Sequence, residues 1–226
     1  MSIAAEIAVE VAETVPLLLD GLVITVAICG LATLFALVAS VLILLARRSG
    51  RRWLSWAAIG YVSLMRGLPI VILIFLMYFG IPALLDLGRV SAFWIGVLAL
   101  GMNGAAFLSE VLRGAIARLP AGQTEAAWAL GLGRVRTWRL ILVPQLLPVA
   151  LPALAGEVGF LIKASPVLSL ITVVDLTRRS QQVTMQTFDP LVPLLAAALL
   201  YFLLIGAIAL FARWLEQRLA KRIAGR

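Results

Sequence analysis

The chain has 226 residues, is 63% hydrophobic and only 13% charged, and has a mean hydropathy of +1.08 with a net charge of +8. About a quarter of the residues in a soluble domain are charged, so this composition excludes that class and predicts an all-α, polytopic membrane protein. Nucleic-acid binding is also disfavoured, because the cations form short clusters beside apolar runs and not a soluble basic face.

Residue usage restricts the chemistry as well. The chain has no histidine, which is the commonest metal ligand and the commonest general base. Cys29 is the only cysteine and lies in an apolar run, where it fits a small packed residue. No convincing nucleophile–base pair is present. We therefore expect no catalytic residue, no metal site and no cofactor bound by this chain, and a membrane-embedded enzyme is disfavoured.

The chain opens with an acidic lead-in and not with a cleavable signal peptide. Residues 1–13 contain Glu6, Glu10 and Glu13 but no Lys or Arg. A signal peptide would carry positive charge there.

Five apolar runs follow, and each exceeds the roughly 20 residues that a helix needs to cross a bilayer. The first two are longer than one crossing requires, so tilt or extension beyond the membrane is expected. We treat residues 1–226 as a single transmembrane domain. The runs cover about Pro16–Ala46, Trp53–Leu85, Ala92–Leu112, Leu146–Val174 and Leu191–Phe211.

The distribution of Lys and Arg predicts the orientation, because cytoplasmic loops carry the excess of these residues. Fourteen cations fall on one side of the predicted spans and three on the other. The N-terminus is therefore expected outside and the C-terminus in the cytoplasm, as an odd number of spans requires. The three outer cations are Arg89, Arg178 and Arg179.

Residues 113–145 form the longest predicted cytoplasmic loop and interrupt the apolar pattern. Thr124 is expected to cap a short helix, with Glu125 in its first turn, where the helix dipole favours a carboxylate. Gly131 and Gly133 are expected to end this helix, since glycine accepts the left-handed conformation found at helix ends.

A second, basic helix is expected over about Arg134–Leu142. In the first helix the small side chains of Ala126 and Ala127 let another surface approach closely, and Trp128 and Leu130 offer that surface apolar contacts. The segment is thus predicted to be a cytoplasmic docking element. The alternative is an interfacial helix that only connects two spans and places its arginines on lipid headgroups.

The spacing in this segment resembles the EAA loop of ABC importer permeases. That loop reads E-A-A, three residues, G, nine residues, I, one residue, L-P. Here Glu125-Ala126-Ala127, Gly131, Ile141 and Pro144 fall at the matching positions, and Val143 stands where Leu is usual. The resemblance implies that the loop fits a groove on a separate ATP-binding subunit and carries that subunit's motion into the membrane. The implied coupling residues are Glu125, Ala126, Ala127, Trp128, Leu130, Gly131 and Arg134.

Three longer stretches are similar to the polar amino acid permeases within that family. They are "YVSLMRGLPIVILIFLMYFGIP" (Tyr61–Pro82), "SEVLRGAIARLPAGQTEAAWALG" (Ser109–Gly131) and "FLIKASPVLSLITVVDLT" (Phe160–Thr177). Two departures stand out: Leu68 replaces a Thr, and Ala164 replaces an acid.

The resemblance implies a type I ABC importer permease in the bacterial inner membrane, which imports polar amino acids by alternating access. ATP and Mg²⁺ would bind to the separate subunit, since this chain has no G-x-x-x-x-G-K-[ST] phosphate loop. An extracytoplasmic solute-binding protein would deliver the amino acid. Five spans are too few to enclose a path with two gates, so a second permease copy or a paralogue is expected. The alternative is a secondary transporter or channel subunit that ATP does not drive, but the inverted repeat typical of such transporters is missing from the span pattern.

Four ionisable residues are expected at membrane depth, namely Arg66, Glu110, Glu157 and Lys163. Each costs at least about 2.5–3.5 kcal/mol to insert, so each is a functional candidate. Glu157 and Lys163 lie about 120° apart on one helix and cannot pair with each other, so they could contact the two charges of an amino acid. In the alternative, Lys163 pairs with backbone carbonyls at a helix break and Glu157 pairs with Arg66 or a polar neighbour. Glu110 is expected to pair with Arg113, three residues on.

Pro166 cannot donate a hydrogen bond to the Ile162 carbonyl, so the fourth span should kink or unwind there. Exposed backbone is tolerated in a membrane where it lines a cavity or is buried in protein. Residues Lys163–Ser169 are therefore a candidate wall of the solute path, although a kink repaired by neighbours is the alternative. The candidate path residues are Arg66, Glu157, Lys163 and Ser165.

Overall fold

The computed structural model describes residues 3–224, and this part of the chain folds into helices without a β-strand. A bilayer offers no partner for backbone polar groups, so apolar runs of this length satisfy them within helices. The long helices are α1 (Ile3–Arg47), α2 (Arg52–Gly67), α5 (Ala92–Ala117), α8 (Val143–Ala164) and α10 (Leu191–Ala224). The shorter elements are α3 (Ile70–Phe75), η1 (Leu76–Gly80), α4 (Ile81–Leu84), α6 (Gly122–Ala129), α7 (Arg134–Thr137), η2 (Trp138–Leu142), η3 (Ser165–Ile171) and α9 (Leu176–Thr187).

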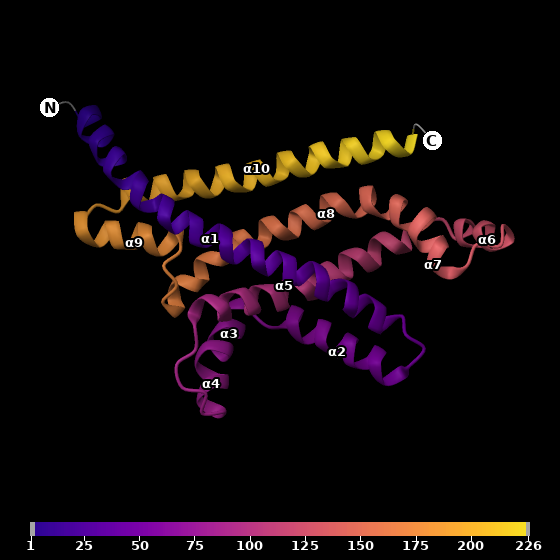
Figure 1. The fold of residues 1–226 in the computed structure, drawn as a ribbon. Helices are drawn as coiled ribbons and strands as arrows, with labels where there is room; N and C mark the ends of the chain where they lie inside the picture. Colours follow the sequence, from indigo (N-terminus) through magenta and orange to yellow (C-terminus); the bar gives the residue numbers. More distant parts are fainter. Residues whose placement is uncertain (1–2, 225–226) are drawn as a thin grey trace.

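The helix bundle has two distinct ends (Figure 1). One end carries α6, α7 and the last turns of α10, and we call it the loop end. The opposite end carries α9 and the first turns of α1, and we call it the α9 end. The first turns of α1 and the last turns of α10 therefore lie at opposite ends of the bundle.

Within the described range, four helical stretches are long and apolar enough to cross a membrane. A fifth crossing results only if the pair formed by Arg52–Gly67 and Ile70–Leu84 counts as one span, and this pair is bent by 107°. The second predicted run, about Trp53–Leu85, thus contains a sharp break that the sequence analysis did not place. The four stretches are Thr14–Arg47, Ala92–Ala117, Arg134–Ile171 and Leu191–Leu219.

The break in the second span is set by Pro69. Proline has no N–H and forces the preceding residue out of the helical region, and Leu68 accordingly has φ −90° and ψ 133°. The carbonyl of Met65, four residues before the proline, thereby loses its helical partner. The side-chain amide of Asn103 on α5 donates to that carbonyl at 2.8 Å. A buried side chain of another helix thus stabilises the break.

A second break follows α8 and confirms the expectation for Pro166. The α-helix ends at Ala164 and continues as the 3₁₀ helix η3. The hydroxyl of Ser165 donates to the Ile162 carbonyl at 2.9 Å, which is the carbonyl that Pro166 leaves without its helical donor. Both proline breaks are therefore satisfied by a nearby polar side chain.

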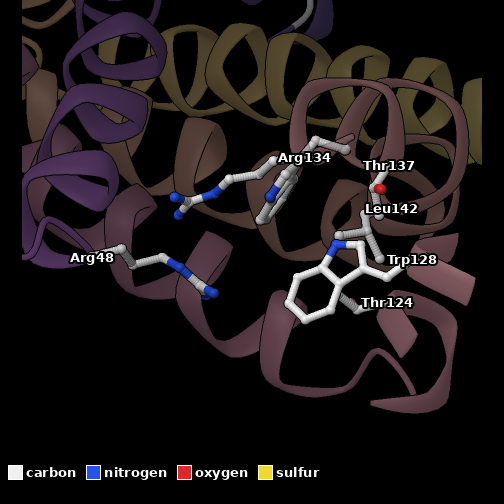
Figure 2. Close-up of a pocket in the computed structure, with 7 residues that line it drawn as sticks. Arg48, Thr124, Trp128, Arg134, Thr137 and Leu142 are labelled. Atoms are coloured by element: carbon white, nitrogen blue, oxygen red, sulfur yellow. The ribbon is translucent and has the colours of Figure 1, made fainter. Parts of the chain in front are cut away.

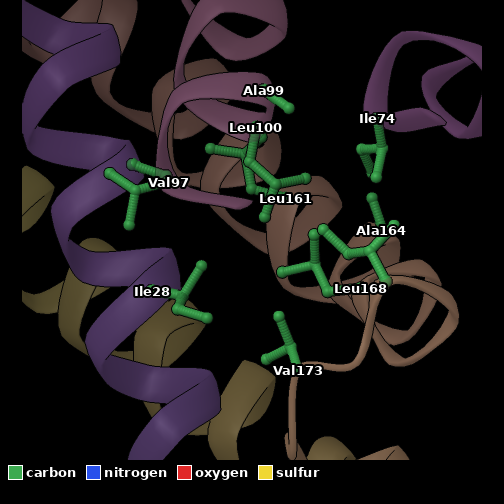
Figure 3. Close-up of a cluster of buried hydrophobic side chains, with 11 residues drawn as sticks. Ile28, Ile74, Val97, Ala99, Leu100, Leu161, Ala164, Leu168 and Val173 are labelled. Atoms are coloured by element: carbon green, nitrogen blue, oxygen red, sulfur yellow. The ribbon is translucent and has the colours of Figure 1, made fainter. Parts of the chain in front are cut away.

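The main apolar cluster lies between α1, α5, α8 and η3 (Figure 3). Lipid tails are as apolar as these side chains, so close packing and not removal from water is what stabilises the cluster. In contrast, α10 exposes most of its apolar surface, with Phe202 71% exposed. The buried members of the cluster are Ile28, Ala32, Ile74, Val97, Ala99, Leu100, Leu161, Ala164, Leu168, Ile171 and Val173.

Candidate functional site

The short helix α6 in the 113–145 segment begins at Gly122, three residues earlier than expected. Its N-cap position is Ala121, which has no side-chain cap, and Thr124 lies inside the first turn. The predicted Thr124 cap is therefore wrong. The reason is that a turn already starts at Pro120, whose carbonyl accepts from the amide of Gln123 at 3.1 Å. A carboxylate in the first turn is confirmed, because Glu125 occupies it.

The end of α6 is set by Gly131, as predicted. Its φ of +74° is in the left-handed region, where glycine carries no Cβ penalty. The amide of Gly131 donates to the Trp128 carbonyl at 2.9 Å, and the amide of Leu132 donates to the Ala127 carbonyl at 3.0 Å. These two bonds form a Schellman motif, which closes the helix and turns the chain toward α7.

The predicted coupling residues differ in exposure. Ala127 is buried, with 1% of its surface accessible, whereas Trp128 is 61% exposed and Leu130 is 79% exposed. The loop therefore presents two large apolar side chains at its surface. Ala127 packs inside the loop, so its small size serves the loop's own fold. The exposed members are Glu125, Ala126, Trp128, Leu130, Gly131 and Arg134.

The basic helix predicted over Arg134–Leu142 is present, but its second half is wider than an α-helix. Residues Trp138–Leu142 form the π-helical turn η2, and the amide of Val143 donates back to the Trp138 carbonyl. Pro144 lies in the first turn of α8. The chain thus returns from the loop to the membrane span without a linker, and π-helical turns of this kind are frequent at functional sites.

A cavity of about 320 Å³ lies between the loop and the end of α1 (Figure 2). Arg48 extends toward it from the turn that follows α1, and its guanidinium carbon lies 5.8 Å from the centroid of the Trp138 ring. The sequence does not single out Arg48, since four arginines cluster in that region and nothing local distinguishes one of them. The cavity is lined by Arg48, Thr124, Trp128, Arg134, Thr137, Trp138 and Leu142.

An ion-pair group lies at the same end of the bundle. Arg113 donates from Nε and Nη2 to Glu110 Oε2 at 2.9 and 2.7 Å, which confirms the predicted pair. Glu110 Oε1 also accepts from Arg47 Nη1, which comes from the end of α1. The carboxylate of Glu110 therefore joins two helices, and this long-range contact was missing from the sequence analysis.

Two of the candidate path residues lie on helices that both pack against α5, namely α2 and α8. Arg66 at the end of α2 stacks its guanidinium over the Phe107 ring at 5.3 Å. Phe107 in turn contacts Phe160 of α8, with ring centroids 6.1 Å apart. Glu157 is half-buried on α8 and lies three residues before Phe160, on the same face of that helix. Within the described part of the chain Arg66 and Glu157 form no salt bridge.

The other two candidates lie elsewhere. Lys163 is exposed and borders a groove of about 360 Å³ between α8 and α10, together with Ile205 and Glu216. Ser165 is fully buried and donates its hydroxyl to a backbone carbonyl. The structure thus brings Arg66 near Glu157 and leaves Lys163 and Ser165 apart from them. Hydrogen bonds from Lys163 to carbonyls at the break, the alternative role, are not found among residues 3–224.

This chain matches a known protein family over most of its length. The model of the family described as "Binding-protein-dependent transport system inner membrane component" matches residues 39–221. The chain is 34% identical over 205 residues to the arginine transport system permease protein ArtQ of Bacillus subtilis (strain 168), covering 91% of this chain and 93% of ArtQ. It is 33% identical over 202 residues to the putative glutamine transport system permease protein GlnP of Rickettsia bellii (strain RML369-C), covering 89% and 92%.

Solved structures share the fold. A chain of an amino acid ABC transporter, crystallised with histidines, superposes with a TM-score of 0.83 at 29% identity, covering 92% of this chain and 96% of that one. A chain of the inward-facing MetNI methionine ABC transporter superposes with a TM-score of 0.74 at 21% identity, covering 90% and 96%. At that lower identity the likeness concerns the fold alone.

Proposed function

This chain belongs to the family of binding-protein-dependent transport system inner membrane components, and from that premise we propose that it is the permease subunit of an ATP-driven ABC importer for polar amino acids. The observation that carries the coupling role is the exposed tip of the loop. Trp128 and Leu130 are largely exposed beside the carboxylate of Glu125. An apolar and charged tip of this kind fits a groove on a partner protein.

The partners of the proposed complex follow from the family and from what this chain lacks. A separate ATP-binding subunit binds ATP and Mg²⁺, hydrolyses the ATP and docks at the loop end, which places that end in the cytoplasm of a bacterial inner-membrane protein. An extracytoplasmic solute-binding protein delivers the amino acid at the α9 end. A second permease copy or a paralogue completes the path, and the exposed apolar surface of α10 leaves room for such a partner or for lipid.

The proposed mechanism is alternating access. Closure of the ATP-binding dimer moves the loops, the two permeases open outward and accept the amino acid, and hydrolysis reverses the motion. Such a cycle needs two states that each ligand stabilises to a different degree. The two proline breaks supply places where short helical segments can reorient without breaking a long helix.

Arg66 and Glu157 are the proposed solute contacts within this subunit. They offer one charge of each sign beside the Phe107 ring. An amino acid carries a carboxylate and an ammonium group, so these two side chains could bind one each. Ionisable groups at membrane depth are costly to keep unless they serve a solute or a partner.

The test of the coupling role is Glu125→Lys in proteoliposomes that contain the permease, its ATP-binding subunit and the solute-binding protein. The charge reversal should abolish ATP-driven uptake, because it places a cation in the first turn of α6 and in the docking surface. The matched control is Glu216→Lys, which makes the same reversal on α10, away from α6. Uptake at the wild-type rate in Glu125→Lys would contradict the coupling role.

The test of the solute path is Glu157→Gln. This change keeps the side-chain shape and removes the charge, so uptake of cationic amino acids should fall more than uptake of neutral ones. The measurement is the rate of uptake of a panel of radiolabelled amino acids. Unchanged uptake of every member of the panel would show that Glu157 is structural.

A further inference from the structure

Arg47, the last residue of α1, and Arg48, which follows it in a turn, make contacts in different directions. Arg47 donates from Nη1 to Glu110 on α5, and its backbone carbonyl accepts from the hydroxyl of Ser55 on α2 at 3.1 Å. Arg47 is only about one-fifth exposed. The end of α1 is therefore held against the two helices beside it.

Arg48 points the other way, toward the loop. Its guanidinium lies over the ring of Trp138 at 5.8 Å, and it borders the same cavity as Trp128 (Figure 2). Trp138 is the first residue of η2, the π-helical turn through which the loop returns to the membrane span. Arg48 is thus a contact between α1 and the element that must move when the loop moves.

The same helix has close contacts at its other end. A Cβ placed on Gly21 would lie 2.7 Å from the backbone oxygen of Asp175, so α1 and the start of α9 approach each other closely. The hydroxyl oxygen of Thr25 accepts a hydrogen bond from the amide of Leu176, the first residue of α9, at 3.1 Å. One continuous helix therefore contacts the loop end and the α9 end of the bundle.

We propose that Arg48 is a positioning residue that passes displacement of the coupling loop, through Trp138, into α1, while Arg47 holds that end of α1 against α5. Coupling between distant sites is carried by chains of packed side chains and rigid elements. Here the series of contacts begins at α6 and α7, passes through η2 to Arg48, and then continues along α1 to α9. The inference rests on the proposed function, because it names how the loop's motion enters the bundle.

A simpler role for Arg48 would be to anchor the helix end at the lipid headgroups, as arginines at the ends of membrane helices commonly do. Two observations favour the coupling role. Arg48 lies over an aromatic ring of the loop's return path, and it lines a cavity shared with the docking helix. The anchoring role predicts that any nearby arginine is equivalent to Arg48, and this difference can be measured.

The experiment uses the assembled complex in proteoliposomes, with uptake and ATP hydrolysis measured on the same preparation. Arg48→Ala should leave binding of the ATP-binding subunit and ATP hydrolysis near the wild-type level. The amount of amino acid taken up per ATP should fall about fivefold, the factor expected for loss of one exposed cation–π contact. The matched control is Arg52→Ala, which removes an exposed arginine of the same cluster that contacts no aromatic ring or carboxylate among the described residues. Equal ratios for the two variants would overturn the inference.

A double-mutant cycle identifies the contact itself. Trp138→Leu should lower the uptake per ATP to a similar degree, and the Arg48→Ala/Trp138→Leu double variant should lower it no further. Arg48→Lys keeps the charge with weaker stacking, so it should restore part of the ratio. Additive losses in the double variant would show that Arg48 acts through something other than Trp138.

The outcome for wild type separates this inference from the proposed function. If the wild-type complex shows no ATP-dependent uptake, the proposed function fails and the inference fails with it. If wild type transports and Arg48→Ala transports with the same yield per ATP, only the inference fails.

Discussion

Two adjacent alanines of the coupling loop differ in burial, so the two leucine substitutions should impair the loop in different ways. Ala127 is 1% exposed, and its carbonyl accepts the hydrogen bond from Leu132 that closes α6. Ala126 is exposed. Ala127→Leu should disturb the fold of the loop, whereas Ala126→Leu should leave the fold intact and obstruct the docking surface.

The magnitude follows from packing. Inserting extra methylene groups at a tightly packed position costs about 1–3 kcal/mol. Such a cost raises the open fraction of the loop by about 5–150-fold. Leucine and alanine are both strong helix formers, so Ala126→Leu should change local stability by only a few tenths of a kcal/mol, up or down.

Hydrogen–deuterium exchange of residues 122–132 in detergent measures the first effect, and binding of the ATP-binding subunit measures the second. Ala127→Leu should accelerate the exchange of these amides by about 5–150-fold. Ala126→Leu should exchange like wild type and bind the ATP-binding subunit at least tenfold more weakly, the factor for about 1.4 kcal/mol. Wild-type exchange in Ala127→Leu, or wild-type binding in Ala126→Leu, would refute the division between packing and docking.

Three further predictions concern elements that hold the bundle together. Gly21→Ala should be less stable in detergent than Gly30→Ala, with a difference of about 1–3 kcal/mol, because a Cβ at Gly21 would meet backbone atoms at 2.7 and 2.8 Å while Gly30 has no neighbour within 4 Å. Equal melting temperatures for these two variants would contradict the close contact between α1 and α9. Asn103→Leu should lower stability by about 1–3 kcal/mol, since it leaves the Met65 carbonyl without its donor, and the measurement is again thermal denaturation in detergent. Asp175, which caps α9 between the candidate spans, has its pKa raised by burial from 3.8 to about 6. A raised carboxyl pKa gives stability that is fully present below about pH 4 and is lost as the pH rises through about 6. Asparagine does not ionise, so Asp175→Asn should be more stable than wild type by up to about 3 kcal/mol at pH 7.5 and by much less at pH 4. A difference in melting temperature that does not depend on pH would exclude this titration.

The proline breaks show what the sequence reveals and what it hides. The missing N–H of Pro166 predicts an interruption, and η3 begins one residue before it. The same argument applies to Pro69, but the uninterrupted apolar run around that residue favoured one long span. The physical rule holds equally well at both positions. The direction of the chain after the break, a bend of 107° in the second span, depends on tertiary partners such as Asn103.

Contacts between distant residues could not be predicted from the sequence, for a different reason. The local Glu110–Arg113 pair follows from helix geometry, because residues three apart share a face. The contact between Glu110 and Arg47 joins residues 63 positions apart and depends on how α1 packs against α5. Arg47 and Arg48 are neighbours of the same type, so composition treats them alike. They contact different partners because Arg47 ends α1 and packs against α5, whereas Arg48 lies in the following turn and reaches Trp138.

The divergence of Glu157 and Lys163 has a consequence for how one subunit can bind an amino acid. Helix geometry predicted that the two side chains point about 120° apart. Glu157 comes near Arg66, while Lys163 borders the groove between α8 and α10. Lys163 therefore cannot serve as the cationic partner of Glu157 within one chain. In the proposed solute site that place would fall to Arg66, whose planar guanidinium suits a carboxylate and rests on Phe107. A solute held between Arg66 and Glu157 would bridge α2 and α8, each of which adjoins a proline break, so its binding would bear directly on the segments best able to reorient.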